Sequence, residues 1–77
     1  YPGYALALDS AGQPVWQVQQ WLNGLASLEY YYRYVDQTGI FDPQTRDAVL
    51  IFQGLNDLEE TGVVDEVTWD ALRRAVR

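Results

Sequence analysis

A twelve-residue segment occurs twice in the chain. Residues 38–49 align with residues 61–72, 23 positions later, and six of the twelve positions (Thr, Gly, Asp, Thr, Asp and Ala) are identical. Each copy begins with Thr-Gly and two apolar residues, followed by an Asp and, three residues later, a Thr. An Asp in this position typically caps a helix, because its carboxylate accepts a backbone N–H from the first helical turn. The repeat therefore predicts the same turn and helix start twice.

The two copies predict helices at about residues 43–54 and 66–76. Pro43 supports the first of these starts, because proline is favoured where a helix begins and no backbone N–H is needed. In each helix the apolar residues share one face, which we expect to be the core face. These core-facing residues are Ala48, Val49, Phe52 and Leu55 in the first, and Ala71, Leu72, Ala75 and Val76 in the second.

An earlier helix is predicted from about Gln13 or Pro14 to Leu25, with Val15, Val18, Leu22 and Leu25 on its apolar face. Its start is open, since Ser10 and Gln13 have the spacing of a capping box whereas Pro14 favours a later start. A long aromatic connector (26–37) and a shorter acidic one (54–62) join the helices. The prediction is an all-α fold, a compact three-helix bundle with an internal helix-turn repeat.

We expect residues 1–77 to be a single domain taken from a longer protein, because Tyr1 follows neither a Met nor a leader segment. The chain has no Cys and no His, which excludes disulfides and a zinc hydrolase site within this segment. Its net charge of −6 disfavours nucleic acid and anionic membrane surfaces as partners. No apolar run approaches the roughly 20 residues that cross a bilayer. No cofactor is predicted.

The acidic residues near the two glycine turns raise the possibility of a calcium site or a catalytic carboxylate pair. The calcium interpretation fails on spacing, because Thr45 and Thr68 occupy the loop position that requires a bidentate carboxylate. Asp42 and Asp65 are explained as helix caps, and the remaining carboxylates as solvated or as favourable charges in first helical turns. We therefore expect no metal site and no enzymatic activity of this chain by itself.

Aromatic residues are more numerous than a small core requires. Four tyrosines crowd into the connector, and two tryptophans flank the apolar face of the first helix: Tyr30, Tyr31, Tyr32, Tyr34, Trp16 and Trp21. Exposed rings can stack on a glycan or peptide, although one or two of the tyrosines could instead close the open end of the bundle. Arg33 and Arg46 could bind a ligand carboxylate or pair with a neighbouring Asp.

Three separated motifs lie along the chain between residues 15 and 72. They are Val15-x-x-Val18-Gln19-x-x-Leu22-Asn23, Thr38-Gly39-Ile40-Phe41-Asp42-Pro43-x-Thr45-x-x-Ala48-Val49-x-x-Phe52-Gln53 and Thr61-Gly62-Val63-Val64-Asp65-x-x-Thr68-Trp69-x-x-Leu72. In this order they resemble the peptidoglycan-binding domain of the three-helix type, which also has an internal repeat. The opening Tyr1-Pro2-Gly3, Ser10-x-Gly12 and the aromatic connector resemble members from cell-wall and spore-envelope proteins of Gram-positive bacteria. The chain departs from the family pattern at both turns, with Thr38 and Thr61 for an Asp, and Asp42 and Asp65 for a Gly.

The resemblance implies a noncatalytic module, extracellular in a cell wall or spore envelope, that anchors an attached domain to peptidoglycan or muropeptides. Because the net charge of −6 does not attract an anionic wall polymer, binding would depend on stacking and hydrogen bonds. The predicted ligand-binding residues are Trp16, Tyr30, Tyr31, Tyr32, Tyr34, Gln44 and Arg46. The chain is expected to be a monomer. The alternatives are a protein–protein interaction or scaffold module on the same fold, which has lost glycan binding, and one wall of an enzyme site completed by another domain.

Overall fold

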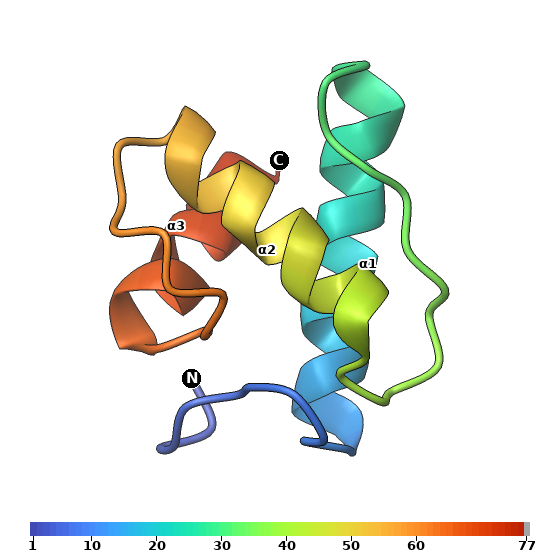
Figure 1. Ribbon diagram of the computed structural model, residues 1–77, viewed down its shortest axis with the longest axis vertical. Coiled ribbons are helices and arrows are strands. Elements are labelled where there is room, and N and C mark those ends of the chain that lie inside the picture. The colour runs from blue at the N-terminus through green and yellow to red at the C-terminus, as the bar shows by residue number, and fades with distance from the viewer. Residues whose placement is uncertain (77) are drawn as a thin grey trace.

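The computed structural model describes residues 1–76 and has three helices, α1 (Gln13–Leu28), α2 (Pro43–Leu55) and α3 (Glu66–Ala75) (Figure 1). The predicted all-α, three-helix fold is confirmed. α1 packs against both other helices, with α2 lying obliquely across it. Within residues 1–76 no helix combines the length and the apolar character needed to cross a bilayer.

The two predicted Asp caps are confirmed. The Asp42 carboxylate accepts the backbone N–H of Thr45, and the Asp65 carboxylate accepts that of Thr68, each at 2.9 Å. α2 begins at Pro43, as predicted from the fixed backbone angle of proline. The repeated sequence therefore produces the same helix start twice.

The first helix begins without a side-chain cap. Gly12 is the N-cap residue, and the Ser10 hydroxyl instead accepts the backbone N–H of Ala7 at 3.0 Å. The capping-box interpretation of Ser10 is therefore wrong, and α1 begins at Gln13. α1 also continues past Leu25 to Leu28, because Ala26 is buried and extends the apolar face.

The core consists of residues from all three helices and from the segments between them: Leu6, Val15, Val18, Leu22, Leu25, Val35, Phe41, Ala48, Val49, Phe52, Val64, Trp69 and Leu72. Ala71, Ala75 and Val76 pack at its edge, and Val76 follows the end of α3. Leu55 was predicted to be a core residue and is 50% exposed. The prediction for Leu55 is wrong because this last residue of α2 lies on an exposed face of the helix.

A buried glutamine holds the first Thr-Gly turn. The Gln19 side chain comes from α1 and is fully buried. Its Oε1 accepts the N–H of Gly39 at 2.8 Å, and its Nε2 donates to Ile40 O at 2.9 Å and to Thr45 Oγ1 at 3.0 Å. One side chain thus ties α1, the turn and the first turn of α2 together.

Gln53 does the same for the second turn, from α2. Its Oε1 accepts the N–H of Gly62 at 3.0 Å, and its Nε2 donates to Val63 O at 3.0 Å and to Thr68 Oγ1 at 3.1 Å. Gln53 also accepts the N–H of Thr61 at 3.0 Å. Because buried amides must satisfy their hydrogen bonds, the two glutamines fix the geometry of both turns.

The N-terminal segment connects the two repeats. Leu6 exchanges backbone hydrogen bonds with Val64, of 3.0 Å and 2.8 Å. Further along, Asp9 N–H donates to Phe41 O at 2.9 Å and Phe41 N–H donates to Ser10 O at 2.8 Å. This segment runs from the α3 side to the start of α1 across one end of the bundle (Figure 1).

Candidate functional site

The aromatic connector is fixed to the helices by side-chain amides at several points. Asn23 of α1 forms two hydrogen bonds with the backbone of Val35, accepting its N–H at 2.8 Å and donating to its carbonyl at 2.9 Å. Gln44 of α2 accepts the N–H of Asp36 at 2.7 Å. The part of the connector that follows Leu28 is therefore held in place between α1 and α2, although it has no regular secondary structure.

The connector tyrosines form a row of rings from the core to solvent. Tyr32 is partly buried against Phe52, with ring centroids 6.2 Å apart, and its hydroxyl accepts a hydrogen bond from Asn56 at 3.2 Å. Tyr31 contacts Tyr32 with a centroid separation of 5.3 Å, and Tyr30 lies beyond Tyr31 at 5.6 Å and is 95% exposed. Tyr32 thus closes the bundle, whereas Tyr31 and Tyr30 extend outward.

The Tyr31 hydroxyl interacts with a carboxylate two residues away. It donates a hydrogen bond to the Glu29 carboxylate, and this bond raises the pKa of Tyr31 above its ordinary value, with further contributions from desolvation and from the Glu29 charge. The bond orients the hydroxyl and leaves the ring half exposed.

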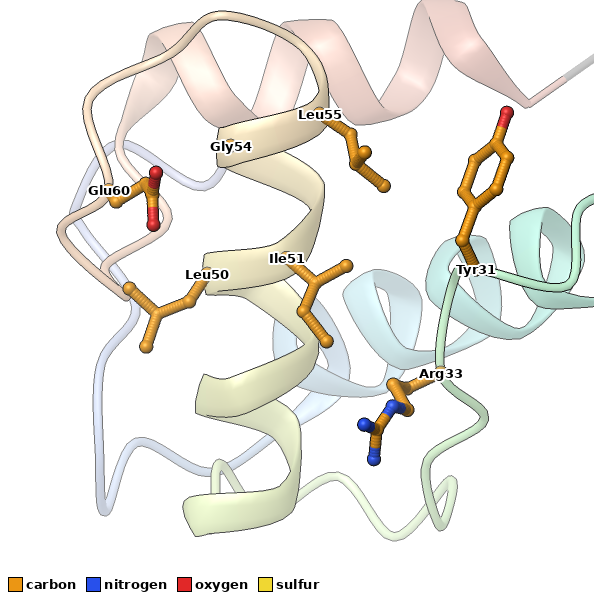
Figure 2. Close-up of a pocket in the computed structure, with 7 residues that line it drawn as sticks. All are labelled: Tyr31, Arg33, Leu50, Ile51, Gly54, Leu55 and Glu60. Carbon is orange, nitrogen blue, oxygen red and sulfur yellow. The ribbon is translucent and has the colours of Figure 1, made fainter.

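An open groove of about 420 Å³ lies along the exposed face of α2, between the connector on one side and the loop that follows α2 on the other (Figure 2). We call it the α2 groove, and the residues that line it are Tyr31, Arg33, Leu50, Ile51, Gly54, Leu55 and Glu60. Its volume falls in the range of about 300–1,000 Å³ typical of small-ligand sites.

The α2 groove combines an apolar floor with opposite charges at its two sides. Leu50, Ile51 and Leu55 project from α2 into it (Figure 2). Arg33 enters from the connector, and among residues 1–76 it forms no ion pair, unlike Arg46 and Arg73. Glu60 enters from the opposite side.

A smaller hollow of about 130 Å³ adjoins the groove along α2. Its lining includes Arg33, which also lines the groove, together with Tyr34, Gln44 and Asp47. Because Arg33 is common to both, the two hollows form one continuous surface on α2 and the connector.

Comparison with known proteins then identifies the family. Residues 11–72 match the family model described as "Putative peptidoglycan binding domain". The chain belongs to this family. Among curated proteins, none matches the chain significantly in sequence.

Solved structures share the fold of this peptidoglycan-binding domain. The SleB N-terminal domain superposes with a TM-score of 0.88 at 21% identity, over 100% of this chain and 99% of that one. A fused Zn-dependent amidase/peptidase/peptidoglycan-binding domain-containing protein from Clostridium acetobutylicum ATCC 824 matches 90% of the chain at 29% identity, with a TM-score of 0.79. The Burkholderia AP3 phage endolysin matches 96% at 30% identity, with a TM-score of 0.80. The matched regions are 28% and 26% of the last two structures, respectively.

The departures from the family pattern have a local explanation in this peptidoglycan-binding domain. The hydroxyls of Thr38 and Thr61 accept the N–H groups of Ile40 and Val63, each at 3.1 Å, within their own turns. A threonine hydroxyl thus stabilises each turn where the family has an Asp, as hydroxyl side chains commonly do in turns.

The predicted ligand-binding residues are not all brought together. Tyr31 lines the α2 groove, and Tyr34 and Gln44 line the adjoining hollow. Trp16 lies partly buried on α1 beside the first turn, outside both hollows. Arg46 packs over the second turn and forms an ion pair with Asp47 at 3.3 Å. This ion pair is the alternative to ligand binding that the sequence left open for Arg46.

Several lining residues were not predicted as site residues. Leu50 and Ile51 belong to an uninterrupted apolar run, residues 48–52. One core-facing helix side needs fewer apolar residues than this run contains. The additional apolar residues are the signal that could have identified Leu50 and Ile51. Glu60 was interpreted as a solvated charge. Nothing local in the sequence places it beside α2. Within residues 1–76 no cluster of side chains is suited to hold a metal ion.

Proposed function

We propose that this chain is a noncatalytic module that binds peptidoglycan and anchors an attached domain to a cell wall or spore envelope, outside the cell. The observation that carries the proposal is the α2 groove, with its half-exposed tyrosine ring, its aliphatic floor and an arginine without an ion-pair partner among residues 1–76. Membership of the peptidoglycan-binding family supports it.

The chemistry of the groove suits a polymer of sugars and short peptides. The ring of Tyr31 offers an apolar face on which a sugar or an alanine methyl can pack. The guanidinium of Arg33 matches the geometry of a carboxylate and can bind it through two parallel hydrogen bonds. These contacts offset the unfavourable net charge of −6 locally.

The fixed connector strengthens this proposal. Asn23 and Gln44 hold the connector backbone, and Tyr32 supports the ring of Tyr31 from the core side. A ligand would therefore meet a surface that is already ordered, which reduces the entropy cost of binding. In this proposal Tyr31 and Arg33 contact the ligand directly. Tyr30, Tyr34 and Gln44 extend the surface, whereas Trp16 and Arg46 lie outside it.

Cosedimentation with purified insoluble peptidoglycan tests the proposal. The wild type should be depleted from solution, and Tyr31→Ala and Arg33→Gln should each weaken binding by about five- to tenfold, since one lost stacking or charged contact costs about 1 kcal/mol or more. The matched controls are Tyr4→Ala and Arg73→Gln, two exposed side chains outside the groove. A wild type that stays in solution, or controls that weaken binding as much as the groove variants, would refute it.

A further inference from the structure

We infer that the α2 groove recognises the peptide stems of peptidoglycan, and that it prefers a stem whose diamino acid still has a free side-chain amine. This inference rests on the proposed function and names the part of the polymer that the groove binds. It depends on the opposite charges at the two sides of the groove, Arg33 from the connector and Glu60 from the loop after α2.

The two charges are separated and available for a ligand. Figure 2 shows Leu50 and Ile51 between Arg33 and Glu60, and the two charged side chains form no ion pair with each other. Each is exposed, and neither has a charged partner among residues 1–76. A ligand with both a carboxylate and an amine would therefore complete two ion pairs across an apolar floor.

The Glu60 carboxylate lies against α2 at Gly54, which has no side chain. A Cβ built at Gly54 would lie 3.0 Å from Glu60 Oε2 and 3.2 Å from its Cδ. Glycine in a helix is less stable than alanine by up to about 1 kcal/mol. Here it gives the carboxylate space to lie over the last turn of α2, at the edge of the groove.

The chemistry of peptidoglycan decides which component fits. Its N-acetylated sugars offer hydroxyl and acetamide groups but no cation, so they can give Glu60 a hydrogen bond but no ion pair. A peptide stem has carboxylates, and the diamino acid of an uncrosslinked stem has an ammonium group. Crosslinking converts this ammonium into a neutral amide. A carboxylate at the groove edge therefore favours the uncrosslinked stem, because it would lose a charged hydrogen bond with the crosslinked one.

The dimensions of the groove agree with a short peptide. Its floor extends from Leu50 to Leu55, five residues along α2, which corresponds to about 7.5 Å at 1.5 Å per residue. An extended peptide advances about 3.3 Å per residue. Two to three residues of a peptide stem therefore fit along the floor.

Titration of the protein with three soluble probes tests the inference. The probes are the peptide L-Ala–γ-D-Glu–L-Lys–D-Ala, the same peptide with its lysine amine acetylated, and an N-acetylated chito-oligosaccharide. The free-amine peptide should bind, acetylation should weaken binding by at least about fivefold, and the oligosaccharide should not compete. Glu60→Gln should abolish the preference for the free amine. The control Glu59→Gln, an exposed neighbour outside the groove, should retain it.

The outcomes separate this inference from the proposed function. Three results would overturn the inference: equal binding of the two peptides, an unchanged preference in Glu60→Gln, or binding of the oligosaccharide alone. If the wild type still sediments with insoluble peptidoglycan in those cases, the proposed function stands without it. A wild type that binds neither the insoluble polymer nor any probe overturns both.

Discussion

Replacing Gln53 by methionine keeps a long side chain but removes the hydrogen bonds that hold the second turn. The N–H of Gly62 loses its side-chain acceptor, whereas the carbonyl of Val63 keeps the Thr61 hydroxyl as a donor at 3.2 Å. Gly62 is buried and Gln53 is only 1% exposed, so water does not replace the amide at low cost. A buried polar group left without a partner costs about 1–3 kcal/mol, so the unpaired N–H of Gly62 should cost about 2 kcal/mol. This is about half of the roughly 3–5 kcal/mol that such a small core supplies.

Urea unfolding followed by tryptophan fluorescence measures the effect. With a slope of about 1 kcal/mol per molar urea, the midpoint of Gln53→Met should fall by about 2 M. Gln20→Met, an exposed position on α1, is the control and should change the stability by less than about 0.5 kcal/mol. Thr68→Val removes only one acceptor of the Gln53 amide and should cost about 1 kcal/mol, which is measurable even if Gln53→Met is unfolded in water. A midpoint of Gln53→Met as high as that of Gln20→Met would refute the reasoning.

Asp42→Ala and Asp65→Ala each remove a cap with a 2.9 Å hydrogen bond, and each should lower the free energy of unfolding in urea by about 1 kcal/mol. A loss of stability in only one of the two variants would contradict equivalent roles of the two caps. Gly62→Ala places a Cβ where φ is +72° and should cost more than about 1 kcal/mol, whereas an unchanged midpoint would show that the turn adapts freely. The bond from Tyr31 to Glu29 raises the pKa of Tyr31 above 10.0, so its stabilising effect is complete below about pH 10 and is lost as the pH rises through the raised pKa. In an alkaline absorbance titration, the difference between the wild type and Tyr31→Phe reports the ionisation of Tyr31. Tyr31 should ionise above about pH 10, and ionisation at or below that value would argue against the bond.

The helix starts could be predicted because their causes are local. Asp42 and Thr45 are three residues apart, as are Asp65 and Thr68, so the cap and its donor both lie within one short sequence pattern. The end of α1 was less predictable, because it depends on whether Ala26 finds a place in the core, which is a property of the packing.

The role of the two buried glutamines could not be predicted from the repeat. Gln19 precedes Thr38 by 19 residues (38 − 19), whereas Gln53 precedes Thr61 by 8 (61 − 53), so an alignment at a constant offset of 23 does not superimpose them. Each of these glutamines also lies next to a core-facing residue in the sequence, so it does not interrupt the apolar pattern of its helix. Only the fold shows that each amide reaches one of the two turns.

The candidate site was predicted only in part, because some of its contacts are likewise visible only in the fold. The sequence indicated that some connector tyrosines are exposed and that Arg33 is available for a carboxylate, because the number of rings exceeds what a small core needs. It could not place Leu55 and Glu60 beside them. These contacts form between segments more than 20 residues apart in the chain, and they depend on the path of the connector across α2.

The α2 groove lies where the two repeats differ. The buried glutamines fix both Thr-Gly turns, and their hydrogen bonds do not depend on the length of the segment before each turn. That segment can therefore vary without loss of the bundle. In the first copy it is the long connector, which supplies Tyr31 and Arg33, and in the second it is the short loop that supplies Glu60. α2 stands between the two segments and contributes the floor. Because the segments that precede the two turns thus flank the same helix from opposite sides, a fold built on a duplicated turn can present opposite charges to one ligand.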